Sequence, residues 1–301
     1  MPSRTRALPF VLLIAAAAIY GGIFSLNKIA AEAGLPPIGY AFWQSLGAGA
    51  VLLVVSLAMR APPGLGFAHL RAYLVIGALA IGLPTALLTY VAPNLPVSIL
   101  TMVLALSPPL TYLFGMAARI ERFYWLGTAG ILCGFGGVLV LVGPTAALPD
   151  SEMVGWFLMS LAAPAMFAGS NVSAALLRPP ATTSVAMACG VLLGSSALLL
   201  VVMLATGQTY GFPDFPSSGD WALLMAIGVN TVFVVLFLEI IRLSGPVFFA
   251  QFNYLAVFSG IAWGWAVFGE SLNAMIWVAF ALMVIGVVLI SIKPRAAAGT
   301  G

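Results

Sequence analysis

Apolar residues run through the chain in long, continuous stretches that are separated by short polar connectors. A membrane-spanning helix needs about 20 mostly apolar residues. Ten stretches meet this requirement, approximately residues 9–31, 38–59, 70–91, 96–118, 123–143, 153–177, 184–205, 221–241, 246–268 and 272–292. They lack the alternation of apolar and polar residues that is typical of transmembrane strands. The pattern therefore predicts an all-α polytopic membrane protein with ten transmembrane helices.

The composition agrees with this prediction and limits the partners. Hydrophobic residues make up 62% and charged residues 6% of the 301 residues, whereas a typical soluble protein has about 25% charged residues. So few charges cannot cover the surface of a soluble protein, and a disordered chain would be richer in charge. The net charge is +3, but the basic residues are scattered and form no patch for a nucleic acid. We expect a lipid bilayer around the protein and no nucleic-acid partner.

Basic and acidic residues divide the connectors into two sets. If the N-terminus lies inside, every basic residue except Lys28 falls in a cytoplasmic segment, namely Arg4, Arg6, Arg60, Arg71, Arg119, Arg122, Arg178, Arg242, Lys293 and Arg295. The opposite face then collects Glu32, Asp150, Glu152, Asp214, Asp220 and Glu270. Because cytoplasmic connectors carry an excess of Lys and Arg, both termini are expected in the cytoplasm. The first stretch exceeds the ~7–15-residue core of a signal peptide, so we expect it to be a retained span.

The two halves of the chain show an internal repeat. Residues 115–142 align with residues 264–291, which superposes Gly115 on Gly264, Glu121 on Glu270 and Gly137 on Gly286. Each half holds five predicted spans, an odd number, so the second half must enter the membrane from the opposite side. We therefore expect two inverted five-helix repeats, residues 1–147 and 148–301, an arrangement that recurs in secondary transporters.

The sequence FGESLNAMIWVAFALMVIGVVLI at residues 268–290, its degenerate copy after Glu121 and the doubled layout resemble the EamA-type drug/metabolite transporter superfamily. Within it, the chain is most similar to bacterial inner-membrane exporters of aromatic amino acids. The resemblance implies ten helices around a central cavity, lined chiefly by spans 1–4 and 6–9 and braced from outside by spans 5 and 10. It also implies a bacterial inner-membrane location. The first copy departs from the pattern, because Glu121-Arg122 falls on the cytoplasmic side, so no role is transferred to Glu121.

Several kinds of catalytic site are missing from the sequence. Neither Lys28 nor Lys293 follows a glycine, so there is no Walker A loop for ATP. The only histidine, His69, lies at the entrance of a span, which excludes the HExxH motif and a histidine-based triad. No aspartate lies within a predicted span. We expect no enzymatic activity, no cofactor and no metal site.

Charged side chains inside a membrane are costly and often functional. Lys28 lies in the outer third of the first span, with Glu32 one helical turn later. They are expected either to pair at the membrane surface or to place Lys28 at the cavity mouth. Glu239 precedes Arg242 near the cytoplasmic end of the eighth span. This pair is expected to close the inner end, or Glu239 could couple transport to protons.

Uncharged polar and aromatic residues within the spans are the candidate lining of a substrate site. The substrate-binding candidates are Tyr20, Asn27, Trp43, Gln44, Tyr90, Thr101, Asn171, Asn230, Gln251, Asn253, Tyr254 and Trp263, with Tyr40, Thr85, Thr89 and Ser107 as further lining residues. Buried amides can equally well join helices, and Tyr40 and Trp43 could belong to the interfacial aromatic belt. Gln251, Asn253 and Tyr254 crowd one turn, which favours a site there.

Prolines and glycines predict bends and close packing. Pro84, Pro164 and the pair Pro108-Pro109 lie within predicted spans, where proline interrupts the helix and can act as a hinge. Pro108 and Pro109 are the strongest gating candidates, because both lie at mid-membrane depth. Three small-residue pairs, Gly130/Gly134, Gly190/Gly194 and Gly260/Gly264, indicate close helix contacts, either within the chain or in an oligomer. The oligomeric state does not follow from the sequence.

A cavity with aromatic rings, hydroxyls and amides but almost no fixed charge suits a neutral, zwitterionic amino acid. A strongly anionic solute would need buried Arg or Lys residues. We expect export of aromatic and other neutral amino acids by alternating access without ATP, as facilitated diffusion. The alternatives are a proton-coupled multidrug or metabolite exporter that uses Glu239 or Glu32, and a membrane scaffold or enzyme subunit without transport.

Overall fold

A computed structural model describes residues 4–142, 151–213, 215–250, 252–270 and 274–291, and all regular structure in these residues is helical. The elements are α1 (Arg4–Tyr20), α2 (Ile23–Glu32), α3 (Pro37–Ala58), α4 (Phe67–Gly77), η1 (Ala78–Gly82), α5 (Leu83–Val91), η2 (Ala92–Asn94), α6 (Val97–Val103), η3 (Leu104–Leu106), α7 (Ser107–Ala117), α8 (Trp125–Val142), α9 (Ser151–Ser160), α10 (Ala162–Leu176), α11 (Ser184–Thr206), α12 (Ser218–Ser244), α13 (Pro246–Ala250), α14 (Phe252–Phe268) and α15 (Ala274–Ser291). Many predicted spans consist of two or three consecutive elements.

Eight helical runs within the described residues are long and apolar enough to cross a membrane. They are Leu8–Glu32, Pro37–Ala58, Phe67–Asn94, Val97–Ala117, Glu152–Leu176, Ser184–Thr206, Ser218–Ser244 and Pro246–Phe268. The predicted fifth and tenth spans correspond to α8 and α15. Within the described residues, the apolar helical stretches of these two helices are shorter than those of the other eight spans. A helical polytopic membrane protein is confirmed, whereas the count of ten spans stays a prediction.

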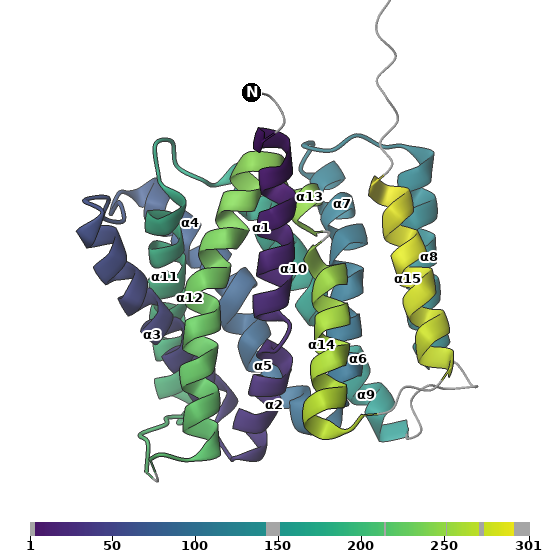
Figure 1. Cartoon of the computed structure of the whole chain (residues 1–301). Coiled ribbons are helices and arrows are strands. Elements are labelled where there is room, and N and C mark those ends of the chain that lie inside the picture. Colours follow the sequence, from purple (N-terminus) through teal and green to yellow (C-terminus); the bar gives the residue numbers. More distant parts are fainter. Residues whose placement is uncertain (1–3, 143–150, 214, 251, 271–273, 292–301) are drawn as a thin grey trace, which may run out of the picture.

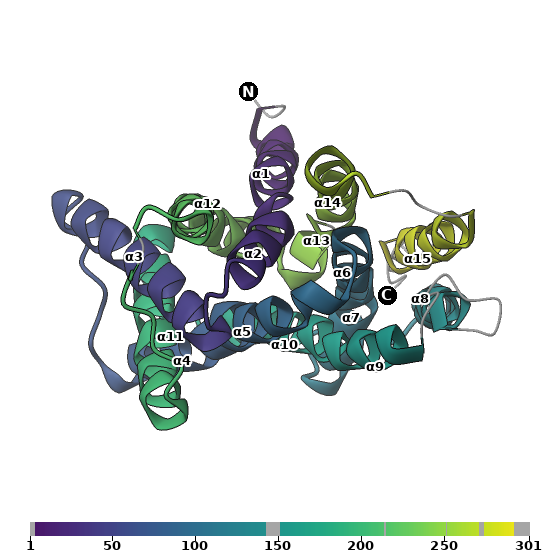
Figure 2. The ribbon, with the colours of Figure 1, turned by 90° about the horizontal axis from the view of Figure 1, so that it is seen from below.

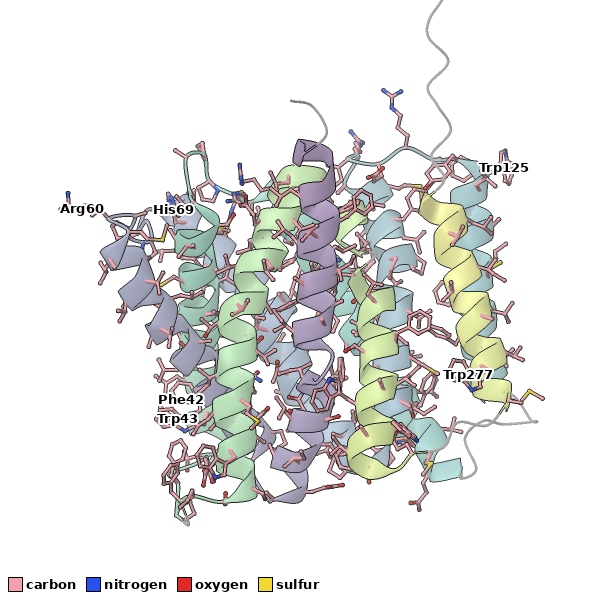
Figure 3. All side chains as sticks on the ribbon, viewed as in Figure 1. Phe42, Trp43, Arg60, His69, Trp125 and Trp277 are labelled. Carbon is pink, nitrogen blue, oxygen red and sulfur yellow. The ribbon has the colours of Figure 1, made fainter. Side chains whose placement is uncertain are left out.

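The helices stand side by side in one bundle (Figure 1). The N-terminal end of α1 lies at one face of the bundle, and Arg60 and His69 lie at the same face (Figure 3). We call this the inner face, because the sequence predicts that it lies in the cytoplasm, and the opposite face the outer face. Seen from below, α8 and α15 lie together at one end of the bundle, and α3, α4 and α11 lie at the other (Figure 2).

The main helix contacts repeat between the two halves of the chain. Each of the first five predicted spans has its counterpart five spans later in the chain. When counterparts are exchanged, the contact α1/α12 corresponds to α4/α10, α1/α14 corresponds to α7/α10, and α3/α12 corresponds to α4/α11. All six of these contacts are present. The contacts α3/α11, α6/α14 and α8/α15 join counterparts directly. The helix packing therefore has an approximate twofold pattern.

The repeated glycine–glutamate motif has the same local geometry in both halves. The N–H of Glu121 donates to the carbonyl of Gly115 at 3.1 Å, and the N–H of Glu270 donates to that of Gly264 at 3.4 Å. Each glutamate side chain covers its glycine, because a Cβ at Gly115 would lie 2.9 Å from Glu121 Cγ and one at Gly264 would lie 2.8 Å from Glu270 Oε2. The alignment of the two motifs therefore corresponds to a structural similarity.

The three small-residue pairs pack inside the molecule. A Cβ at Gly286 would lie 2.5 Å from the carbonyl oxygen of Gly130 and 2.9 Å from the backbone nitrogen of Gly134. Likewise, Cβ atoms at Gly190 and Gly194 would collide with Tyr73, and one at Gly260 would collide with Thr101. Of the two expected uses of these pairs, the structure shows the internal contact.

Candidate functional site

A narrow pocket lies in the middle of the bundle. Its lining residues come from six of the predicted spans and are Tyr20, Ala80, Leu104, Ser107, Phe167, Ser170, Asn171, Phe233, Phe237, Phe249, Phe252 and Asn253. The empty space is about 350 Å³, of which only about 30 Å³ is open to the centre of a water molecule. A solute as large as an amino acid therefore needs the pocket to widen.

The pocket lies where regular helices are interrupted. Tyr20 is the last residue of α1, before the Gly21-Gly22 turn that leads into α2. Ala80 belongs to η1, a π-helical segment, and Leu104 belongs to the 3₁₀ turn η3. Discontinuous helices of this kind form the substrate sites of many secondary transporters, and single π turns are frequent at functional sites.

Proline explains the interruptions in the third and fourth spans. Pro84 follows η1 and lacks the N–H that would bond the carbonyl of Ala80 in an α-helix. Pro108 likewise lacks the N–H that would bond the carbonyl of Leu104, and the N–H of Ser107 reaches that carbonyl through the 3₁₀ turn. The predicted proline bends at these two places are therefore local changes of helix type beside the pocket.

Glycine allows the first span to approach the ninth where it turns. A Cβ at Gly21 would lie 1.9 Å from Ser259 Oγ, and one at Gly22 would lie 3.3 Å from the ring of Trp263. A larger residue at Gly21 would push α14 away from α1. The Gly21-Gly22 pair therefore fixes the place where the first span turns beside the pocket.

Aromatic rings form one wall of the pocket. The rings of Tyr20 and Phe233 stack with centroids 3.9 Å apart. Phe249 and Phe252 stack at 5.3 Å with an interplanar angle of 9°, and Phe252 lies 5.1 Å from Phe233. These phenylalanines were missed by the sequence analysis, because in a membrane protein a phenylalanine that lines a pocket has the same sequence signal as one that faces lipid.

Polar side chains from three spans lie at or beside the pocket. The amide of Asn171 donates to Thr111 Oγ1 at 3.1 Å, and Thr111 donates to the carbonyl of Ser107 at 2.8 Å. The amide of Asn253 donates to the carbonyl of Ala250 at 2.9 Å. Ser107 Oγ is buried and has no hydrogen-bond partner within the described structure. Hydroxyl and amide groups are thus present at the pocket, and none of its described lining residues carries a full charge.

The pocket contains only part of the predicted lining. Tyr20, Ser107, Asn171 and Asn253 line it. Gln251 lies outside the described residues, and so does the side chain of Tyr254.

Asn27 and Gln44 belong to a different buried group, between α2 and α3. Tyr40 donates a hydrogen bond of 3.0 Å to Asn27 Oδ1, and Gln44 Nε2 donates one of 3.4 Å to the hydroxyl of Tyr40. Gln44 Oε1 is buried without a hydrogen-bond partner among the described residues. These side chains join two helices and are not lining residues of the central pocket.

Five other candidates have structural contacts away from the pocket. Trp43 Nε1 donates to the carbonyl of Tyr210 at 2.8 Å, which ties α3 to the connector before α12 at the outer face (Figure 3). Tyr90 and Trp263 are 51% and 47% exposed. Thr101 and Asn230 bond carbonyls within their own helices. The structure does not bring these five side chains to the central pocket.

The expected pair of Lys28 with Glu32 is replaced by a different one. Lys28 Nζ lies 3.9 Å from Glu270 Oε1 and 4.7 Å from the ring centre of Phe268. Glu32 is the last residue of α2 and is exposed. Lys28 turns toward the end of α14 because this carboxylate and this ring lie there. Of the two expected alternatives, the Lys28–Glu32 pair was therefore wrong, whereas Lys28 does line a cavity, one separate from the central pocket.

The expected pair at the inner face is present. Arg242 Nε donates to Glu239 Oε2 at 2.9 Å, and a second guanidinium nitrogen contacts the other carboxylate oxygen. Ser184 also donates to Glu239, and Arg178 donates to Ser184 at 2.9 Å and to the carbonyl of Leu238 at 3.0 Å. The network joins the connector between α10 and α11 to the inner end of α12, and Glu239 is not among the residues of the central pocket.

Comparisons with known proteins agree with a transporter fold. Residues 8–143 match the EamA-like transporter family, which supports a membrane transporter of the drug/metabolite superfamily. A solved structure titled "Crystal structure of protein" is similar to 97% of this chain over 99% of its own length, with a TM-score of 0.65 and 17% identity. At this identity the likeness shows the fold alone. No curated protein matches the chain.

Proposed function

We propose that this protein exports neutral amino acids with aromatic or large apolar side chains across the bacterial inner membrane, by alternating access and without ATP. The observation that carries the proposal is the position of the uncharged, aromatic pocket at the interruptions of the first, third and fourth spans. Helix interruptions around a central site are a recurring feature of secondary transporters.

The proposal includes ten spans in two inverted repeats, residues 1–147 and 148–301, with both termini in the cytoplasm. Three observations support it: the repeated helix contacts, the matching geometry around Glu121 and Glu270, and the odd number of predicted spans in each half. In an inverted repeat the two halves can exchange conformations, which would close the central pocket toward one side of the membrane and open it toward the other.

The chemistry of the pocket suits a zwitterion with an apolar side chain. The rings of Phe233 and Phe252 offer faces for an aromatic or aliphatic side chain. The amide oxygens of Asn171 and Asn253 can accept hydrogen bonds from an ammonium group, and the hydroxyl of Ser107 can donate one to a carboxylate. A cationic drug would require a carboxylate, and a phosphate ester would require arginine or lysine, and neither is found among the described lining residues.

Facilitated diffusion is the simplest mechanism for this site. Proton coupling requires a carboxylate that both the proton and the substrate can reach. Glu239 is engaged by Arg242 and Ser184 at the inner face, and Glu32 is exposed at the outer end of α2. Neither lines the central pocket, which makes proton-coupled export the second candidate.

Uptake by purified protein in proteoliposomes tests the proposal. Labelled phenylalanine should enter in the absence of any ion gradient, with saturation, and unlabelled leucine and tyrosine should compete. Lysine, glutamate and ethidium should compete poorly, because the pocket offers no opposite charge. Uptake that appears only under a proton gradient would replace diffusion by coupled exchange, and ethidium transport without amino-acid transport would refute the substrate class.

A further inference from the structure

One carboxylate connects three spans at the outer face. Glu270 follows α14 closely, and its two oxygens accept hydrogen bonds from the backbone N–H groups of Val97 at 2.6 Å and Ser98 at 2.9 Å. Lys28 Nζ, on α2, lies 3.9 Å from the same carboxylate. Glu270 thereby joins the outer ends of the first, fourth and ninth predicted spans.

The local backbone holds Glu270 in this position. Gly269 has φ +65°, a conformation that favours glycine, and it turns the chain sharply after Phe268. The absence of a side chain at Gly264 leaves room for the carboxylate, since a Cβ there would lie 2.8 Å from Glu270 Oε2. The ring of Phe268 lies beneath the ammonium of Lys28 at 4.7 Å.

Glu270 and Lys28 are mostly buried, yet both border a cavity at the outer face. The side chains of Lys28 and Glu270 are only 14% and 12% exposed, so their attraction is less screened than that of a surface pair. Both nevertheless line a cavity at the outer face, together with Pro96 and Trp156. Hydrogen bonds from N–H groups to a carboxylate are among the stronger ones in proteins. The contact is thus firm, yet it lies where a solute at the outer face could arrive.

The same three spans meet at the central pocket. The first supplies Tyr20 beside the Gly21-Gly22 turn, the fourth supplies Leu104 from η3, and the ninth supplies Phe252 at the start of α14. On the outer side of the pocket, α2, α6 and α14 lead to Lys28, Val97 and Glu270. Separation of these outer segments would widen the pocket toward the outer face, and the contacts of Glu270 oppose that separation.

We propose that Glu270 is an outer latch, which holds the pocket closed toward the outer face and releases Val97, Ser98 and Lys28 when the pocket opens there. The proposal deepens the proposed function, because it rests on alternating access at the central pocket. It does not depend on which solute is carried. Glu270 acts through the positions of the three spans and is not assigned a contact with the substrate.

Thiol labelling at the pocket tests the latch. The parent for this test carries Ser107→Cys, with Cys133 and Cys189 replaced by serine, and is reconstituted in sealed vesicles of known orientation. A membrane-impermeant methanethiosulfonate is added to the face that carries Glu270. We expect Glu270→Gln to raise the labelling rate about tenfold, which corresponds to about 1.4 kcal/mol. Lys28→Met should act in the same direction but less strongly, because the two backbone hydrogen bonds remain.

Glu32→Gln is the matched control, since it removes a carboxylate at the outer face without touching the contacts of Glu270. An unchanged rate in Glu270→Gln would overturn the latch, and so would an equal rise in Glu32→Gln. If Glu270→Gln does not fold, Lys28→Met decides, with faster labelling supporting the latch and an unchanged rate refuting it. Flux is measured separately in the protein that retains Ser107, because this hydroxyl is assigned to the substrate site. Labelling as expected, with no flux of amino acids through that protein, would contradict the proposed substrate and leave the latch standing.

Discussion

The ring of Tyr20 stacks on the ring of Phe233, with centroids 3.9 Å apart and ring planes inclined by 29°. This contact joins α1, in the first half of the chain, to α12, in the second. Both rings line the central pocket, and both side chains are buried, at 7% exposure each. The aromatic wall of the pocket is therefore shared between the two halves, and any movement between the halves changes its shape.

Removing a ring from this wall should weaken binding of aromatic substrates. We expect Phe233→Ala to raise the KM for phenylalanine about fivefold, because an aromatic pair contributes about 0.5–1.5 kcal/mol beyond the area that it buries. Leucine should be less affected. Phe258→Ala is the control, since Phe258 lies on α14 but is 52% exposed. Equal effects of the two substitutions on the KM for phenylalanine would show that the wall does not contact the substrate.

Tyr40 should support the fold rather than transport. Tyr40→Phe removes the donor to Asn27 Oδ1 and the acceptor for Gln44 Nε2. Leaving buried polar groups without partners costs about 1–3 kcal/mol, so the thermal unfolding midpoint in detergent should fall. Tyr90→Phe should leave the midpoint unchanged, because Tyr90 is 51% exposed and its substitution leaves no buried polar group without a partner. A strong loss of flux in Tyr40→Phe at full stability would instead place this group in the transport path.

Gly286 should be required for the contact between α8 and α15. In Gly286→Ala, the new Cβ would lie 2.5 Å from the carbonyl oxygen of Gly130, and the backbone must move to avoid it. Such overpacking costs about 1–3 kcal/mol, so the melting temperature should fall. Gly228→Ala is a matched control, because a Cβ at Gly228 meets nothing within 4 Å. Equal melting temperatures for the two variants would mean that the close contact is absent in the membrane.

Glu239 should not be needed for transport. Glu239→Gln weakens the contacts with Arg242 and Ser184 at the inner face but changes nothing in the lining of the central pocket. Flux of labelled phenylalanine without an ion gradient should stay within about threefold of the parent, which corresponds to less than 1 kcal/mol. Uptake is measured once with the same pH on both sides of the vesicle membrane and once with a pH gradient across it. Loss of gradient-driven uptake alone would assign Glu239 to proton-coupled export.

The fold was predictable because its dominant signal is local. Every predicted span contains a helix in the described structure, since a run of about 20 apolar residues has few alternatives to a helix in lipid. The polar candidates Tyr20, Asn171 and Asn253 could also be predicted, because a polar side chain in the membrane interior is costly unless it has a hydrogen-bond partner or lines a polar site.

The rest of the site depends on contacts between distant parts of the chain. The sequence gives no sign that Phe233 lines a pocket while Phe258 faces outward, because both lie in uniformly apolar runs. The partner of Lys28 is Glu270 rather than the nearby Glu32, and only the packing of α2 against α14 brings the two together. Asn230 satisfies its amide on the carbonyl of Ala226 in its own helix, an alternative that any intramembrane asparagine has.

Two asparagines provide the most direct test of the central pocket as the transport site. Asn253 and Asn230 are both buried, and each donates a hydrogen bond to a carbonyl close to it in the chain, but only Asn253 lines the pocket. The decisive measurement is the initial rate of labelled phenylalanine uptake into proteoliposomes, without an ion gradient, for the parent, Asn253→Ala and Asn230→Ala. We predict a loss of about tenfold or more in Asn253→Ala, about 1.4 kcal/mol, and a rate close to that of the parent in Asn230→Ala. Full activity in Asn253→Ala, or equal losses in the two variants, would contradict the assignment of the pocket.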